Sequence, residues 1–314
     1  MRRTFVVGCP RSGTTIVQSL LARHPAVYTL PETAFFEQLY GNLSWRWGDA
    51  GVRLPRPRLR QRLGLGRRQV RELVVALHVQ LTGQRFQGRL GLHEDTLGRQ
   101  FLSLLDRAAD DAGRSMWIEK TPNHLLYIPE IEQLQPDAKF VHVIRRGEDV
   151  LASVIDAHLR FENDAAFGGG AVLWARRWNH AVEVHRMYAN HPSHHIVFLE
   201  DMVRQPDVEW ARLCAFLDLP EDAVLDGANR QSVANLEHEP WKKDAIHGHV
   251  RQSDPKVDGL FGPKMQEWLA ERLSSYQELR SLCRAQPTWV APRPHLIDTA
   301  SGAAAEARWA SASG

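Results

Sequence analysis

Apolar residues along this chain form several short, continuous runs. The clearest are residues 4–7, residues 140–144 (FVHVI) and residues 195–199 (HIVFL), each bounded by turn residues. Continuous apolar runs of this length are typical of strands that are buried on both faces of a parallel sheet. A weaker run at residues 26–30 predicts one more strand, which delivers the polar segment PETAFFE at its carboxyl end.

The segments that follow these runs carry apolar residues at helical spacing. In residues 14–23, Val17, Leu20 and Leu21 share one face, and His24-Pro25 ends the pattern. Similar amphipathic patterns cover residues 69–82, 97–109 and 148–159. The alternation of strands and helices predicts an α/β fold, in which helices flank a central, mostly parallel sheet.

Composition supports one globular unit followed by a tail. The chain has 314 residues, of which 43% are hydrophobic and 24% are charged. Residues 1–285 are expected to form a single domain. From about residue 286 onward Pro, Ala, Ser and Gly dominate, so residues 286–314 are predicted to be disordered.

Charge and cysteine content argue against several classes of protein. The net charge of +2 gives no reason to expect nucleic-acid binding. The three cysteines show neither metal-ligand spacing nor a disulfide framework, which suits a reducing compartment. No apolar run approaches the roughly 18 residues of a membrane span, and the N-terminus is too short for a signal peptide. A cytoplasmic enzyme is therefore expected.

The stretch VVGCPRSGTT, residues 6–15, predicts an anion site between the first strand and the first helix. Backbone N–H groups converge in such a turn, and the helix dipole favours negative charge there. Gly13 closes the turn, while Ser12, Thr14 and Thr15 add hydroxyl donors. The Walker signature needs a lysine where Thr14 stands, and the nearest cation is Arg11, inside the loop.

This loop resembles the 5′-phosphosulfate loop of sulfotransferases that use 3′-phosphoadenosine 5′-phosphosulfate (PAPS). The resemblance implies that Arg11 contacts the donor's phosphosulfate. A second signature of that family, an arginine after a strand and a serine eight residues later, is matched in VHVIRRGEDVLAS by Arg145 and Ser153. Those two residues would bind the 3′-phosphate of the nucleotide, with Arg146 as an alternative to Arg145.

A third match is WIEKTPNHL, which resembles the E-K-T-P segment of Golgi-type and bacterial sulfotransferases. The resemblance implies that Lys120 points toward the sulfuryl group. Lys120 would act catalytically with Arg11 and the loop N–H groups, which together would offset the negative charge that develops on the leaving phosphate oxygen. The likeness spans roughly residues 4–220 and implies the P-loop NTPase-like sulfotransferase fold.

The acceptor hydroxyl needs a base within hydrogen-bond reach. Glu32, at the carboxyl end of the expected second strand, is the first candidate, because that strand should open beside the loop. Tyrosylprotein and heparan-type members of the family use a glutamate in a comparable place. Glu37 is the reserve carboxylate, and among the histidines His124 ranks above His24.

The implied reaction is in-line transfer of a sulfuryl group from PAPS to a hydroxyl, leaving adenosine 3′,5′-bisphosphate and needing no metal. The acceptor stays open: a small molecule, a glycan, a lipid or a peptide. The main alternative is a P-loop kinase or NTPase, because Glu200-Asp201 after the strand at 195–199 mimics a Walker B magnesium site. A non-catalytic nucleotide-binding protein is a third possibility.

Three details of the sequence qualify this picture. Leu199 stands where many relatives carry an aromatic residue that helps to hold adenine. The family's basic closing loop is not recognisable, although Lys256 or Arg251 could serve instead. A set of aromatic residues after Glu32 could line a pocket or belong to the core: Phe35, Phe36, Tyr40, Trp45 and Trp47.

Overall fold

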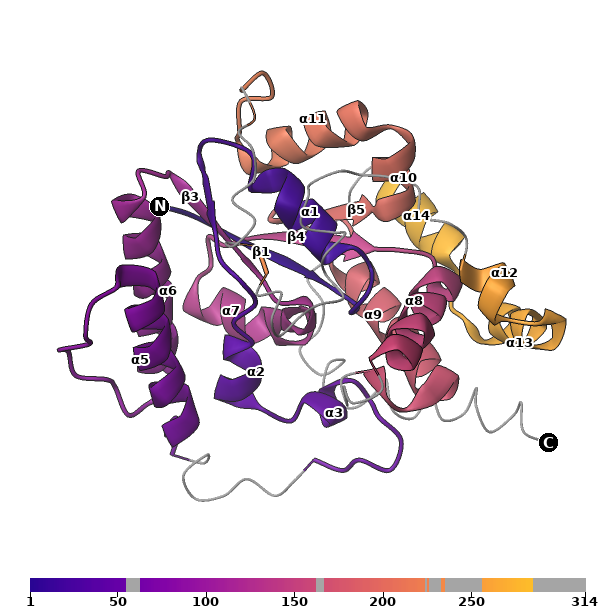
Figure 1. The fold of residues 1–314 in the computed structure, drawn as a ribbon, viewed down its shortest axis with the longest axis horizontal. Helices are drawn as coiled ribbons and strands as arrows, with labels where there is room; N and C mark the ends of the chain where they lie inside the picture. Colours follow the sequence, from indigo (N-terminus) through magenta and orange to yellow (C-terminus); the bar gives the residue numbers. More distant parts are fainter. Residues whose placement is uncertain (55–62, 162–166, 224, 226–232, 235–255, 285–314) are drawn as a thin grey trace.

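A five-stranded parallel sheet forms the centre of the protein (Figure 1). A computed structural model describes residues 1–54, 63–161, 167–223, 225, 233–234 and 256–284. The strands run in the order β2-β3-β1-β4-β5. Their bounds are β1 Arg2–Gly8, β2 Val27–Thr29, β3 Met116–Lys120, β4 Lys139–Ile144 and β5 His194–Phe198.

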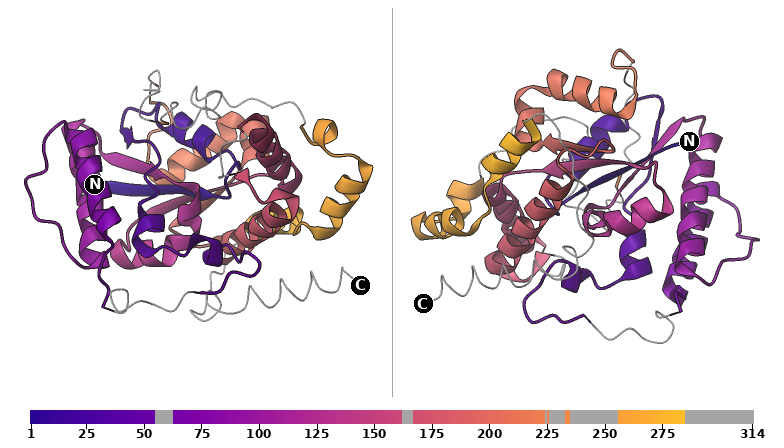
Figure 2. Two further views of the ribbon diagram at one scale, coloured as in Figure 1. Left: turned by 60° about the horizontal axis from the view of Figure 1, so that its bottom comes forward. Right: turned by 180° about the vertical axis from the view of Figure 1, so that it is seen from behind.

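Helices cover both faces of this sheet (Figure 2). Helix α1 (Thr14–Leu21) follows β1 directly, and α8 (Gly147–Arg160) follows β4. The other helices of the first half are α2 Phe35–Tyr40, α3 Leu43–Arg46, α5 Arg68–Thr82, α6 Glu94–Asp111, the 3₁₀ helix η1 Pro122–Tyr127 and α7 Ile128–Leu134. Those of the second half are α9 Gly170–Tyr188, α10 Leu199–Arg204, α11 Pro206–Leu217, α12 Lys256–Leu260, α13 Pro263–Arg272 and α14 Tyr276–Arg284.

The alternation of side chains along each strand separates two apolar cores. In β1, Phe5 and Val7 join the larger core, which includes residues of α2, α6, α7 and α9. Val6, between them, faces a smaller core built with α1 and α11. Because both faces are covered, the central strands read as continuous apolar runs rather than as alternating patterns.

The expected fold class is confirmed, and one strand was not foreseen from the sequence. β3 lies between β1 and β2, so the second strand does not open directly beside the loop that follows β1. β3 has the sequence MWIEK and is buried along its whole length. Its two charged residues interrupt the apolar run, so the sequence pattern does not indicate a buried strand. Leu199 was expected to end the last strand but instead begins α10.

Other expectations concern the core, the tail and the membrane. Phe35, Phe36 and Trp47 are buried core residues, whereas Tyr40 and Trp45 are partly exposed. The predicted disordered tail lies outside the described residues. Within the described part of the chain, no helix combines the length and the apolar character that a membrane crossing requires.

Candidate active site

The loop after β1 has the backbone geometry of an anion-binding turn. It leaves the strand at Gly8 and enters α1 at Thr14, with Arg11 and Gly13 at positive φ angles of 72° and 97°. No side chain caps α1, and Ile16 N in its first turn donates to Gly13 O over 2.9 Å. The amides of Thr14 and Thr15 at the start of the helix are therefore the ones that an anion could use. The Ser12 hydroxyl is fully buried and finds no hydrogen-bond partner among the described residues.

Close packing fixes this loop against the neighbouring elements. A Cβ atom on Gly8 would lie 2.4 Å from the carbonyl oxygen of Val143 in β4. A Cβ atom on Gly13 would lie 2.8 Å from a methyl group of Leu199 at the start of α10. Both glycines therefore allow approaches that a larger residue would prevent. Leu199, expected only to replace an adenine-binding aromatic, in fact packs against the loop.

The predicted residues of the two nucleotide signatures lie together. Arg11 Nε donates to Ser153 Oγ over 3.1 Å, which joins the loop to α8. The Arg145 side chain, 19% exposed, follows β4 and approaches Asp149 at 3.9 Å. Burial and the nearby Arg145 guanidinium lower the pKa of Arg11 to about 10. A phosphate dianion near both guanidinium groups would be stabilising, because it would offset their positive charges.

Lys120 and Glu32 form a second group beside the same loop. The Lys120 side chain is fully buried at the carboxyl end of β3, and its Nζ donates to Glu32 Oε1. It also donates to Thr15 Oγ1 over 3.3 Å, in the first turn of α1. Glu32, whose side chain is 25% exposed, reaches this point from the segment after β2. The inserted strand β3 thus carries the lysine that links the loop to the glutamate.

A buried carboxylate that the sequence did not single out holds this arrangement. Glu119 is fully buried and accepts four hydrogen bonds, from Thr33 N (3.4 Å), Thr33 Oγ1 (2.8 Å), Thr121 Oγ1 (2.7 Å) and His124 Nδ1 (2.8 Å). Burial alone would raise the pKa of Glu119, but His124 and these hydrogen bonds outweigh it and lower the pKa. Glu119 thereby links Thr33, which is next to Glu32, to Thr121, which is next to Lys120.

The reserve bases occupy different environments. His124 is fully buried; its Nδ1 pairs with Glu119 and its Nε2 accepts the N–H of Phe36. His24 similarly uses both ring nitrogens, on Pro220 O and Ala26 N. Glu37 accepts from Asn123 Nδ2 over 3.1 Å, and burial raises its pKa. Both ring nitrogens of each histidine are therefore engaged in hydrogen bonds. Glu37, in contrast, is a carboxyl group whose pKa is raised.

The candidate magnesium pair after β5 is engaged by cations and hydrogen-bond donors. Both carboxylate oxygens of Asp201 accept from Arg280, at 2.5 and 2.6 Å. Glu200 accepts the backbone N–H of Arg146 over 2.9 Å and the hydroxyl of Tyr276. Arg146 itself is 56% exposed and pairs with Asp149 at 2.8 Å. These carboxylates therefore hold the turn after β4 and α14 in place.

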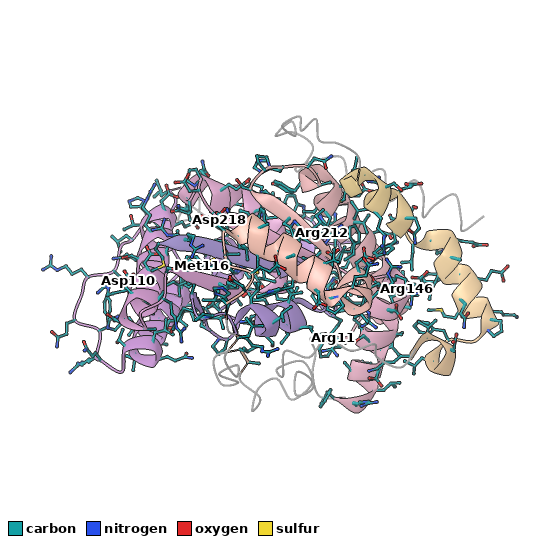
Figure 3. The ribbon with its side chains drawn as sticks, turned by 90° about the horizontal axis from the view of Figure 1, so that it is seen from above. Arg11, Asp110, Met116, Arg146, Arg212 and Asp218 are labelled. Atoms are coloured by element: carbon teal, nitrogen blue, oxygen red, sulfur yellow. The ribbon has the colours of Figure 1, made fainter. Side chains whose placement is uncertain are left out.

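The predicted site residues gather at one edge of the sheet. Arg11 and Arg146 lie toward the same end of the molecule, away from Met116 at the start of β3 (Figure 3). This is the carboxyl edge, where open α/β sheets bind ligands. Lys256, a proposed closing residue, lies in α12 and pairs with Asp156 of α8. The alternative, Arg251, is outside the described residues.

Comparison with known proteins identifies the family of this chain. The model of the sulfotransferase family matches residues 4–223, and the chain belongs to that family. A protein-tyrosine sulfotransferase of Drosophila melanogaster is 26% identical over 228 residues, covering 70% of this chain and 39% of the relative. An uncharacterised protein of Aquifex aeolicus is 25% identical over 238 residues, covering 72% and 26%. The chain thus spans only a minor part of these relatives.

The chain is also similar to solved structures of sulfotransferases. A sulfotransferase from Alicyclobacillus acidocaldarius has a TM-score of 0.46 and 16% identity, with 91% of this chain and 97% of that one covered. A mouse sulfotransferase in complex with PAP has a TM-score of 0.44 and 16% identity, with 90% and 88% covered.

Proposed function

We propose that this protein transfers a sulfuryl group from PAPS to a hydroxyl acceptor. The observation that carries the proposal is the convergence of two groups on one phosphate loop. Arg11, Arg145 and Ser153 gather on the side of α8, while Thr15, Lys120 and Glu32 gather on the side of β3. The first group suits a nucleotide phosphate, and the second suits proton and charge transfer.

The residues present fit the donor. The unpartnered hydroxyl of Ser12 and the uncapped amides of α1 suit the 5′-phosphosulfate, together with Gly13, Thr14 and Thr15. Arg145 would grip the 3′-phosphate through its guanidinium and Ser153 through its hydroxyl. Burial and Arg145 disfavour the charged form of Arg11, which lowers its pKa. A phosphate dianion between the Arg11 and Arg145 side chains would favour that charged form again.

Glu32 would act as general base for the acceptor hydroxyl. In the transfer step the acceptor oxygen forms a bond to sulfur, the bond from sulfur to the 5′-phosphate oxygen breaks, and the acceptor proton passes to Glu32. Lys120 would turn toward the leaving phosphate oxygen and offset its charge. Its full burial, on a strand rather than a loop, gives that ammonium group a defined position.

The contacts around Glu200 and Asp201 weigh against a magnesium-dependent kinase. A Walker B carboxylate must be able to reach the metal, whereas Asp201 is bound by Arg280 through both oxygens. The acceptor class stays open among the four alternatives: a small molecule, a glycan, a lipid or a peptide. The tyrosine sulfotransferase relative makes a peptide tyrosine a sensible first acceptor to test.

Calorimetric titration with adenosine 3′,5′-bisphosphate, ADP and magnesium-ATP tests the donor. We expect tight binding of the bisphosphate and a loss of at least about tenfold in affinity when the 3′-phosphate is missing. Arg145→Ala should remove that difference. Arg107→Ala, which changes an exposed arginine of α6, is the matched control and should preserve it.

Preference for magnesium-ATP, with indifference to the 3′-phosphate, would refute the sulfotransferase proposal and favour a kinase. A protein that binds the bisphosphate tightly must then be assayed with PAPS and a panel of hydroxyl acceptors. Turnover that vanishes in Glu32→Gln and Lys120→Met, with nucleotide binding retained, separates an enzyme from a non-catalytic nucleotide-binding protein.

A further inference from the structure

Three potential metal ligands meet at the edge of the sheet opposite the candidate active site. They are Glu132 in α7, His191 in the turn after α9, and His194 at the first position of β5. Their ligand atoms lie within 4.8 Å of one another. No sequence motif indicates such a cluster, because Glu132 is about 60 positions from the two histidines and only the fold brings it near them.

We propose that Glu132, His191 and His194 form a binding site for a divalent transition metal of the zinc class. Two imidazoles and one carboxylate are a donor set that suits Zn²⁺, with water completing a fourth position. The proposal concerns a site separate from sulfuryl transfer and does not depend on the donor or the acceptor.

The buried ligand His194 is held in a fixed orientation. Its side chain is fully buried and lies between two aromatic rings. Phe140 stacks on it at 4.7 Å with an interplanar angle of 11°, and Tyr188 at 4.4 Å with an angle of 14°. A ring that cannot tilt presents Nε2 in one direction only, toward Glu132 Oε1 at 3.0 Å.

Two further buried histidines support that orientation. His194 Nδ1 lies 2.8 Å from His142 Nε2, and His142 Nδ1 lies 2.9 Å from His185 Nδ1. When His194 binds a metal through Nε2, its single proton sits on Nδ1 and is donated to His142. A histidine ligand that donates its other ring N–H to a buried acceptor is the usual arrangement around protein-bound metals.

The other two ligands are accessible and can adjust. The Glu132 side chain is 30% exposed, and His191 is partly exposed. A zinc ion about 2.0–2.2 Å from each donor needs ligand atoms roughly 3.3 Å apart, so the cluster must contract. Glu132 and His194 already meet that spacing. His191 would exchange its hydrogen bond from Ser193 N, at 3.1 Å, for the metal.

Such a metal would tie α7 to the turn between α9 and β5. Because the ion would bind the folded chain in preference to the unfolded one, it should stabilise the fold by mass action. At a free zinc concentration of about 100 Kd, we expect Tm to rise by about 5 °C.

The test uses the full chain without a histidine tag, after treatment with chelator, titrated with Zn²⁺ and with Co²⁺. We expect one equivalent to bind, with the visible absorption of Co²⁺ in a low-symmetry nitrogen and oxygen site. His191→Ala and Glu132→Gln should each weaken binding by more than about tenfold, the smallest loss seen even when only a residue that supports a metal ligand is changed. At the same zinc concentration each variant should therefore lose at least about half of the Tm shift.

Matched controls come from exposed residues. His158→Ala in α8 and Glu183→Gln in α9 are exposed in the structure and should leave affinity and Tm shift unchanged. Absence of stoichiometric Zn²⁺ binding by the unmodified chain would overturn the proposal. So would binding that both His191→Ala and Glu132→Gln leave intact, because the ion would then be held elsewhere.

Discussion

At the scale of single residues, the chemistry depends on which carboxylate faces the lysine. Glu32 and Glu37 are five positions apart, and the sequence ranks them only by strand position. In the structure Glu32 pairs with Lys120, whereas Glu37 accepts from Asn123. Glu32 is therefore connected to the start of α1, because Lys120 donates to both Glu32 and Thr15.

Replacing Glu32 by Gln should lower kcat by about 10²–10⁴-fold, the range for loss of a general base. The affinity for adenosine 3′,5′-bisphosphate should change little, because Glu32 does not belong to the group that faces the nucleotide. Steady-state kinetics with PAPS and calorimetry give the two readouts. Glu37→Gln is the matched control; if it abolishes turnover while Glu32→Gln does not, the roles of the two carboxylates must be exchanged.

Gly13 offers a second test at this scale. Its φ of +97° already strains any other residue, and its Cβ would also meet Leu199 at 2.8 Å. We expect Gly13→Ala to lower the free energy of unfolding by about 2–4 kcal/mol, combining backbone strain with a steric clash. Urea denaturation measures this, with nucleotide affinity as a second readout.

Gly83→Ala separates the two causes. Gly83 has a positive φ of +67° but nothing within 4 Å of its added Cβ, so it should cost only the strain of about 1 kcal/mol. In the double variant Leu199→Ala and Gly13→Ala, the steric clash between the added Cβ and Leu199 is relieved. The double variant should therefore lose less stability than the sum of the two single variants, and the difference is their coupling energy. Equal costs at the two glycines would show that Leu199 does not restrict the loop.

At the scale of elements, β3 is the part of the fold that assembles the candidate site. Its alternating side chains place Glu119 and Lys120 on opposite faces. Lys120 reaches α1 and Glu32, whereas Glu119 fastens the start of η1 and the segment before α2. One strand therefore supplies both Lys120, the cation proposed to act in the transfer step, and Glu119, which supports the segments around it.

Glu119→Gln should lower the free energy of unfolding by about 2–4 kcal/mol, because a buried acceptor of four hydrogen bonds loses its charge and part of its accepting capacity. It should also lower kcat more than it raises KM, since Glu32 and Lys120 would be displaced while the nucleotide group stays intact. Urea denaturation and kinetics test both effects. Glu183→Gln, on the exposed surface of α9, should change neither.

At the scale of the whole molecule, buried histidines make stability depend on pH. Burial lowers the pKa of His185 to about 3 and that of His180 to about 4. The unfolded imidazoles titrate near pH 6.5, so below that pH the unfolded state binds more protons than the native state. Stability must therefore fall as the pH falls from about 6.5 toward the folded pKa values.

Each of these histidines should cost up to about 2 kcal/mol of stability by pH 5. Urea denaturation at pH 7, 6 and 5 gives the slope, and His185→Gln should reduce that slope even if it lowers stability at every pH. His158→Gln, at an exposed position of α8, should leave the slope unchanged. A stability that stays constant between pH 7 and pH 5 would contradict neutral burial of His185 and His180.

The sequence by itself determined the fold class and the turn that joins β1 to α1. Strand runs such as FVHVI, and the passage from β1 through Gly13 into α1, are local signals, because the periodicity and the turn residues are read from neighbours in the chain. The same holds for the eight-residue spacing of Arg145 and Ser153 within one strand-to-helix connection.

Only the tertiary structure decided what those local features meet. The order of the strands places β3 between β1 and β2, and that insertion brings Lys120 to Glu32. The same packing puts Leu199 against Gly13 and assembles Glu132, His191 and His194 at the opposite edge. Such contacts join residues that are tens of positions apart, and their energy depends on burial and distance in the folded chain, which no local pattern encodes.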